Sequence, residues 1–189
     1  MTPIIVILLI DFEGHPLLSN DEVLNNLRFS HLKNFIFNPI SDNSQRGYRF
    51  LFISNHDEHH EKMIELQKMS EAEGYHEWIN IKPEQEYTPH YLNEMIGDKG
   101  YSIQNIIAGG CNTAGCMLNT KSYSPVRWAK AGYPIQIFLP MCADYQLQGS
   151  TTFESQMNGI SNLYRGLIEK DAIFDVDVIM NAWQIKGLN

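Results

Sequence analysis

The sequence predicts a three-layer α/β/α domain built on a mainly parallel, doubly wound sheet of about six strands. The main observation is alternation: short apolar runs rich in β-branched residues are followed by longer segments whose apolar residues recur at helical spacing. No internal repeat, linker or low-complexity tract interrupts this pattern, and a chain of 189 residues suits one domain that spans residues 1–189.

The predicted strands are the apolar runs. Residues 4–10 form an unbroken run that ends at Asp11, which is typical of a central strand covered on both faces. The run at residues 103–108 stops at Gly109 and Gly110, where the backbone can turn sharply and a ligand can come close. The remaining strands are expected at residues 49–54, 77–82, 134–139 and 171–176.

The predicted helices separate these strands. In the first of them Val23, Leu24 and Leu27 recur at helical spacing behind Asn20, which is a suitable N-cap. Helices are expected at residues 20–34, 57–73, 88–97, 116–131 and 151–168. Because helical segments connect the strands, we expect the strands to run parallel.

Composition narrows the class of function. A net charge of -8 makes a nucleic-acid partner unfavourable. No apolar run approaches the length of a membrane span, and the run at residues 4–10 lacks the basic flank and cleavage site of a signal peptide. The 3 cysteines have no C-x-x-C spacing, which argues against a disulfide framework. We therefore expect a protein of the reducing cytoplasm with no nucleic-acid or membrane partner.

Three reactive side chains are predicted at one edge of the sheet, because ligands of such sheets bind at the carboxyl ends of the strands. Asp11 follows the first strand, Lys82 closes the third, and Cys116 lies beyond the fourth, where a helix is expected to begin. Free N–H groups at a helix start and a nearby ammonium both favour the thiolate that a nucleophile requires. The carboxylate can accept the thiol proton and return it to a leaving amine. Lys99 is the alternative lysine.

Further residues near this edge are candidates for contact with a substrate. The N–H groups of residues 112–116 are suited to hold a developing oxyanion, and two aromatic residues lie just beyond strand ends. The candidates for substrate or oxyanion contacts are Phe12, Cys111, Asn112, Thr113, Gly115 and Tyr145. An isolated cysteine more often serves as a small buried hydrophobe, and this is the alternative for Cys111 and Cys142.

The segment from Gly110 to Cys116 reads G-x-x-T-x-x-C and resembles the nucleophile turn of the isochorismatase-like cysteine hydrolases. That family includes nicotinamidases and N-carbamoyl amidohydrolases, and the likeness extends over most of the chain. The resemblance implies a triad in which Asp11 is the base, Lys82 its cationic partner and Cys116 the nucleophile. It also implies a homo-oligomer, either a dimer or a tetramer.

A second cluster of polar residues follows the second predicted strand. Asp57 and His59, with His76 further along the chain, resemble the D-x-H…H metal site of nicotinamidases, and such ligands suit zinc, iron or manganese. Alternatively, this segment opens a helix, where acidic residues are favourable and the histidines are solvated. We expect no cofactor, and these three residues are the candidates should a metal bind.

Together these features predict a cysteine hydrolase that cleaves a C–N bond of a small amide or carbamoyl compound through a covalent acyl-enzyme on Cys116. Two alternatives remain open. One is a metal-assisted, nicotinamidase-like amidase, and the other is a non-catalytic small-molecule-binding or scaffold protein with the same fold.

Overall fold

The computed structural model describes residues 1–10, 50–55, 59, 61–72, 76–81, 88–111, 117–118, 124–143, 152–173, 176–180 and 184–186. Its strands are β1 (Thr2–Ile10), β2 (Phe50–Ser54), β3 (His76–Asn80), β4 (Tyr101–Cys111), β5 (Ile135–Ala143) and β6 (Asp177–Ile179). Its helices are α3 (Glu61–Ala72), α4 (Pro89–Asp98), α5 (Pro125–Lys130) and α6 (Thr152–Glu169).

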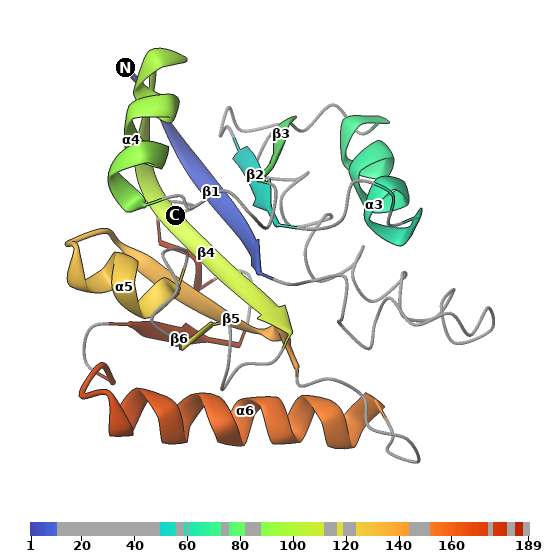
Figure 1. Ribbon diagram of the computed structural model, residues 1–189, viewed down its shortest axis with the longest axis vertical. Coiled ribbons are helices and arrows are strands. Elements are labelled where there is room, and N and C mark those ends of the chain that lie inside the picture. Colours follow the sequence, from blue (N-terminus) through green and yellow to red (C-terminus); the bar gives the residue numbers. More distant parts are fainter. Residues whose placement is uncertain are drawn as a thin grey trace.

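The described strands form one 6-stranded parallel sheet in the order β3-β2-β1-β4-β5-β6 (Figure 1). The chain adds β2 and β3 on one side of β1, then returns to add β4, β5 and β6 on the other side. Strand order therefore reverses between β1 and β4, which is the switch point of a doubly wound sheet. The fold class predicted from the sequence is confirmed.

β1 is a central strand, as its unbroken apolar run predicts. Every residue from Ile4 to Ile10 is buried. The strand pairs with β2 from Ile5 opposite Phe50 onwards, and with β4 along its other side. A strand with neighbours on both sides and helices over both faces has no solvated face, so no polar residue interrupts it.

The helices form layers on the two faces of the sheet (Figure 1). Alternate β1 residues such as Val6 and Leu8 join one apolar cluster with Leu92 of α4, Trp128 of α5 and Leu163 of α6. The intervening residues of β1 are also buried but lie outside that cluster, as do the buried residues of α3, Met63 and Leu66. Because side chains alternate between the faces of a strand, α4, α5 and α6 cover one face and α3 covers the other.

Two of the predicted helices are confirmed, each with its predicted length and shifted by one residue. α4 begins where its sequence indicates, because the Thr88 hydroxyl accepts a hydrogen bond from the backbone N–H of Tyr91 (3.2 Å) and Pro89 takes the first helical position. α6 spans Thr152–Glu169, so it begins and ends one residue later than the predicted 151–168. α3 begins at Glu61, later than the predicted residue 57, and the helix predicted at 20–34 lies outside the described residues.

Two strands extend further than predicted towards the carboxyl edge of the sheet. β4 runs through Gly109 and Gly110 to Cys111, and β5 runs to Ala143 rather than ending at residue 139. A Cβ atom on Gly110 would lie 2.1 Å from the carbonyl oxygen of Ile10. The glycine therefore lets β1 approach β4 closely, and the strand does not stop there as its lack of a side chain suggested.

Two predicted elements are wrong in extent. The helix predicted at 116–131 is not continuous, because Ser124 is extended (φ -62°, ψ 130°) before Pro125, where α5 begins. Residues 116 and 119–123 of that prediction lie outside the described residues. The strand predicted at 171–176 is not found in its described residues, 171–173 and 176, and β6 begins instead at Asp177. Asp171 adopts a φ of 50°, and the N–H of Ala172 bonds to the carbonyl oxygen of Leu167 (2.8 Å), so these residues close α6.

In the described part of the chain, no helix is both long enough and apolar enough to cross a membrane.

Candidate active site

The carboxyl ends of the strands line up at one edge of the sheet. Ile10, the last residue of β1, lies opposite Gly110 of β4, and β4 ends one residue later at Cys111. The strand that precedes Asp11 and the strand that precedes the Cys116 segment therefore end side by side. On the other side of β1, Leu9 lies opposite Ser54 of β2. The two strands that flank the switch point therefore supply the predicted base and the predicted nucleophile segment.

Two glycines set the tight approach of the strands at this edge. A Cβ atom on Gly109 would lie 2.2 Å from Cβ of Met141, and one on Gly110 would meet the backbone of Ile10. No side chain fits at either position without moving β1 or β5. These glycines therefore serve the packing of three strands just before the chain leaves for Cys116.

Lys82 follows β3 at the same edge. The buried residue before it, Ile81, donates its N–H to the carbonyl oxygen of Ser54 (2.8 Å), so the parallel pairing of β2 and β3 continues to the residue that precedes Lys82. β2 separates β3 from β1, which places their backbones about 10 Å apart. A lysine side chain that reaches Asp11 must therefore pass over the end of β2.

Two polar residues at that end of β2 were not predicted from the sequence. Ser54 and Asn55 are both buried, and the Ser54 hydroxyl accepts a hydrogen bond from Nε1 of Trp78 (2.9 Å). The rings of Phe52 and Trp78 stack beside them with centroids 4.9 Å apart. Two consecutive polar residues at the end of an apolar strand were a signal available in the sequence, and they lie between the strand ends that precede Lys82 and Asp11.

The third cysteine, Cys142, lies under this edge and cannot serve as a nucleophile. It is opposite Gly110 in β5, its side chain is fully buried, and its Sγ lies 3.8 Å from Sδ of Met117. Burial raises the pKa of the Cys142 thiol to about 12, against the smaller lowering effect of a hydrogen bond with the backbone of Gly110. The thiol stays protonated at neutral pH, in agreement with its interpretation as a small buried hydrophobe.

Several predicted site residues lie outside the described residues, and their neighbours in the chain define where the chain leaves the sheet. Cys111 is the last residue of β4 and pairs with Ala143. Those outside the described residues are Asp11, Phe12, Asp57, Lys82, Asn112, Thr113, Gly115, Cys116 and Tyr145.

Two of the three candidate metal ligands, His59 and His76, are among the described residues. His59 is exposed and follows the carboxyl end of β2. His76 is the first residue of β3, opposite Phe50, so its backbone lies about 13 Å along the strand from the carboxyl end. Ligands of one metal ion lie within a few ångströms of one another, so the register of β3 does not favour His76 and His59 as ligands of one ion. Asp57 lies outside the described residues. We therefore derive no catalytic step through a metal.

The alternative lysine, Lys99, lies at the opposite edge. It follows α4, next to Gly100, whose carbonyl oxygen accepts a hydrogen bond from the N–H of Thr2 at the start of β1. Its Nζ lies 3.2 Å from a carboxylate oxygen of Glu77. Lys99 therefore belongs to the amino edge and cannot substitute for Lys82.

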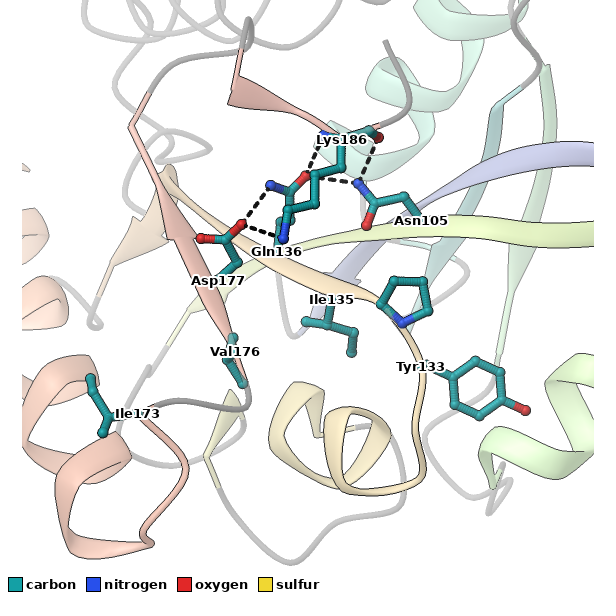
Figure 2. Close-up of a pocket in the computed structure, with 9 residues that line it drawn as sticks. Asn105, Tyr133, Ile135, Gln136, Ile173, Val176, Asp177 and Lys186 are labelled. Carbon is teal, nitrogen blue, oxygen red and sulfur yellow. Dashed lines mark hydrogen bonds and ion pairs between the residues drawn. The ribbon is translucent and has the colours of Figure 1, made fainter. Parts of the chain in front are cut away.

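A cavity of about 440 Å³ also lies at the amino edge, not at the carboxyl edge (Figure 2). Its polar side chains bond to one another: Nδ2 of Asn105 donates to Oε1 of Gln136 (2.7 Å), and Nε2 of Gln136 donates to Oδ2 of Asp177 (3.1 Å). Nζ of Lys186 lies 3.0 Å from the same Asp177 oxygen. A hydrogen bond from Lys186 lowers the pKa of Asp177, and bonding from Gln136 adds to this against the opposing effect of burial. This is a structural network of paired polar groups, and we do not assign it a ligand.

Comparison with known proteins bears on the fold. No protein-family model matches the sequence, and no curated protein matches it. Among solved structures, the nicotinamidase SaPncA from Staphylococcus aureus superposes with a TM-score of 0.54 at 15% sequence identity, over 95% of this chain and 100% of that chain. YcaC from Pseudomonas aeruginosa gives a TM-score of 0.49 at 12% identity, over 95% of this chain and 76% of that chain.

The likeness to SaPncA covers nearly all of both chains, while the low identity limits what it shows to the arrangement of helices and strands. The fold implied by the resemblance of the sequence motif and the fold shown by the structural likeness to SaPncA agree. The chain thus has the fold of a nicotinamidase, as its resemblance to the isochorismatase-like hydrolases implied.

Proposed function

We propose that this protein is a cysteine hydrolase that cleaves a C–N bond of a small amide or carbamoyl compound, with Cys116 as nucleophile, Asp11 as base and Lys82 as cationic partner. The observation that carries the proposal is the pairing of Ile10 with Gly110. It gives Asp11 and the Cys116 segment adjacent starting points at the switch point of the sheet, where doubly wound folds bind their ligands.

The proposed reaction proceeds in two stages. Asp11 accepts the proton of the Cys116 thiol, and the thiolate sulfur attacks the carbonyl carbon of the substrate. Backbone N–H groups of residues 112–116 hold the oxyanion that forms. As the C–N bond breaks, Asp11 returns the proton to the leaving amine, and the acyl group remains on sulfur as a thioester.

Water completes the cycle. Asp11, again ionised, accepts a proton from water as the water oxygen attacks the thioester carbon, and the acid product leaves as the sulfur is protonated. The ammonium of Lys82 lowers the free energy of both charged forms, the Asp11 carboxylate and the Cys116 thiolate. The buried Ser54 and Asn55 at the end of β2 provide a polar path for that side chain across the strand between them.

The test is a panel of small amides, ureas and carbamoyl acids assayed with the wild type and three variants. We expect Cys116→Ala to lose activity by about 10⁴-fold or more, because the nucleophile is removed. Lys82→Met should lose about 10²–10³-fold, because a charge that stabilises the reacting groups is lost. The matched control is Lys99→Met, which removes a lysine from the opposite edge and should retain wild-type activity.

Full activity in Cys116→Ala would rule out the covalent mechanism. If no compound in the panel is hydrolysed and iodoacetamide alkylates Cys116 no faster than free cysteine, the protein is a non-catalytic binding protein with this fold. Activity that survives in Cys116→Ala but is lost on treatment with a chelator would instead support the metal-assisted amidase.

A further inference from the structure

The two residues directly after Cys116 are held from three sides. Met117 and Leu118 are both buried. Sδ of Met117 contacts Sγ of Cys142 in β5 at 3.8 Å. A Cβ atom on Gly166 of α6 would lie 2.1 Å from Cδ1 of Leu118, so the leucine side chain packs directly against the backbone of that helix.

The third contact comes from Ser124. Its Oγ donates a hydrogen bond to the carbonyl oxygen of Met117 at 2.7 Å, and the serine is fully buried. This bond links Met117 to the residue that precedes α5. It also gives a hydrogen-bond partner to the carbonyl oxygen of a buried residue.

Ser124 precedes α5 in the N-cap position, but its hydroxyl does not cap that helix. Its carbonyl oxygen accepts the N–H groups of Arg127 (2.9 Å) and Trp128 (3.2 Å), while its side chain makes no capping hydrogen bond. A serine at this position ordinarily turns its hydroxyl to the N–H of the second or third helical residue. Here the hydroxyl is directed to the residue that follows Cys116.

We propose that Ser124 is a positioning residue, which fixes the backbone of Met117 and through it the sulfur of Cys116 relative to the base and the surrounding N–H groups. The inference rests on the proposed function of Cys116. Without the bond from Ser124, the Met117 carbonyl loses a partner and the backbone at Cys116 gains freedom. The thiolate then loses part of the fixed N–H and cationic environment that favours it over the thiol.

The test is the rate at which iodoacetamide alkylates Cys116 as a function of pH, with Cys116→Ala as the blank for the other cysteines. In Ser124→Ala we expect the inflection of the profile to move to higher pH, with a rate about tenfold lower at pH 7 and a rate equal to wild type at high pH, where the thiol is fully ionised. Ser124→Thr keeps a hydroxyl and should restore the wild-type profile. Thr88→Ala removes a hydroxyl that does cap a helix, and it should leave the profile unchanged.

Circular dichroism and urea unfolding of each variant establish that the folded protein is the species alkylated. The inference would be overturned, and the proposed function left intact, if Cys116 of the wild type is alkylated faster than free cysteine and Ser124→Ala shows the same pH profile. A shift of equal size in Thr88→Ala would also overturn it, because general destabilisation would then suffice. A wild-type rate no higher than that of free cysteine would remove the proposed function and this inference with it.

Discussion

The amino edge and the carboxyl edge of the sheet both carry buried polar side chains, but these are arranged differently. At the amino edge, both hydrogens of the Asn105 amide are used, one by Gln136 (2.7 Å) and one by the carbonyl oxygen of Lys186 (3.0 Å). The amide of Gln136 is likewise shared between Asp177 (3.1 Å) and the carbonyl oxygen of Gln184 (3.0 Å). These groups hold the segment Gln184–Lys186 against β5 and β6.

At the carboxyl edge, glycines bring the strands together and reactive residues follow the strand ends. Gly110 leaves room for the backbone of Ile10, and the chain then continues to Asp11 on one strand and towards Cys116 on the other. The difference teaches that a buried polar cluster beside a cavity is not by itself a functional site. A network whose donors are already used stabilises the fold, whereas a site needs groups that a substrate can engage.

The largest effect on stability is expected from adding a side chain where β1 and β4 approach each other at the carboxyl edge. Gly110→Ala should lower the free energy of unfolding by about 3 kcal/mol, because its Cβ would collide with the carbonyl oxygen of Ile10. In Gly97→Ala the new Cβ meets nothing within 4 Å and lies inside α4, so this control should gain about 0.5–1 kcal/mol. Urea unfolding measures both, and equal effects would contradict the close approach of β1 and β4.

The buried Cys142, at the carboxyl edge, should make the free energy of unfolding fall at alkaline pH. Burial raises the pKa of its thiol to about 12 in the folded protein. The unfolded thiol ionises near pH 8.5, so above that pH the unfolded state binds fewer protons and stability falls as pH rises. Between pH 9 and pH 11 we expect a loss of about 2 kcal/mol in the wild type beyond that in Cys142→Ala. Parallel pH dependence in the two proteins would mean that the thiol is accessible to water.

A smaller effect is expected from breaking the network at the amino edge. Gln136→Leu keeps the volume of the side chain but leaves the N–H of Lys186 without the partner it has at 2.7 Å. We expect a loss of about 1–2 kcal/mol in the free energy of unfolding. The rate of alkylation of Cys116 in the folded variant should equal that of the wild type, and a change in that rate would contradict the separation of the two edges.

The smallest effect is expected from the ion pair at the rim of the same network. Lys186 lowers the pKa of Asp177, so the stabilisation is present above the unfolded pKa of about 4 and is lost as pH falls through the lower, folded value. Both side chains are substantially exposed, so Lys186→Met should cost less than about 1 kcal/mol at neutral pH. The variant should also lose part of the acid dependence below about pH 4, and unfolding curves at pH 3 and pH 7 measure the difference.

The elements predicted well are those whose signal is local. β1 is an unbroken apolar run, and α4 carries its own N-cap and proline. The segment Gly110–Cys116 stands out in the sequence because its residue types serve a known chemistry. The alternation of strands and helices predicted a strand before it, and β4 does end at Cys111, at the carboxyl edge. The placement of Asp11 and Lys82 after β1 and β3 followed from the same alternation.

The features that the sequence did not reveal depend on partners far along the chain. Asn105 and Lys186 are 81 residues apart, and nothing near either of them indicates that they bond. Ser124 reads as an ordinary helix cap until its hydroxyl is seen to reach Met117. Similarly, Gly109 and Gly110 read as a turn, and only the approach of Ile10 and Met141 explains why the strand continues through them.

The sequence by itself determined the fold class, because hydrophobic periodicity dictates which segments must be covered on both faces and in what order they occur. Only the tertiary structure decided the register, which brings Ile10 opposite Gly110 and sets His76 at the far edge from His59. Register depends on the summed packing of side chains from several strands, and no single segment encodes it.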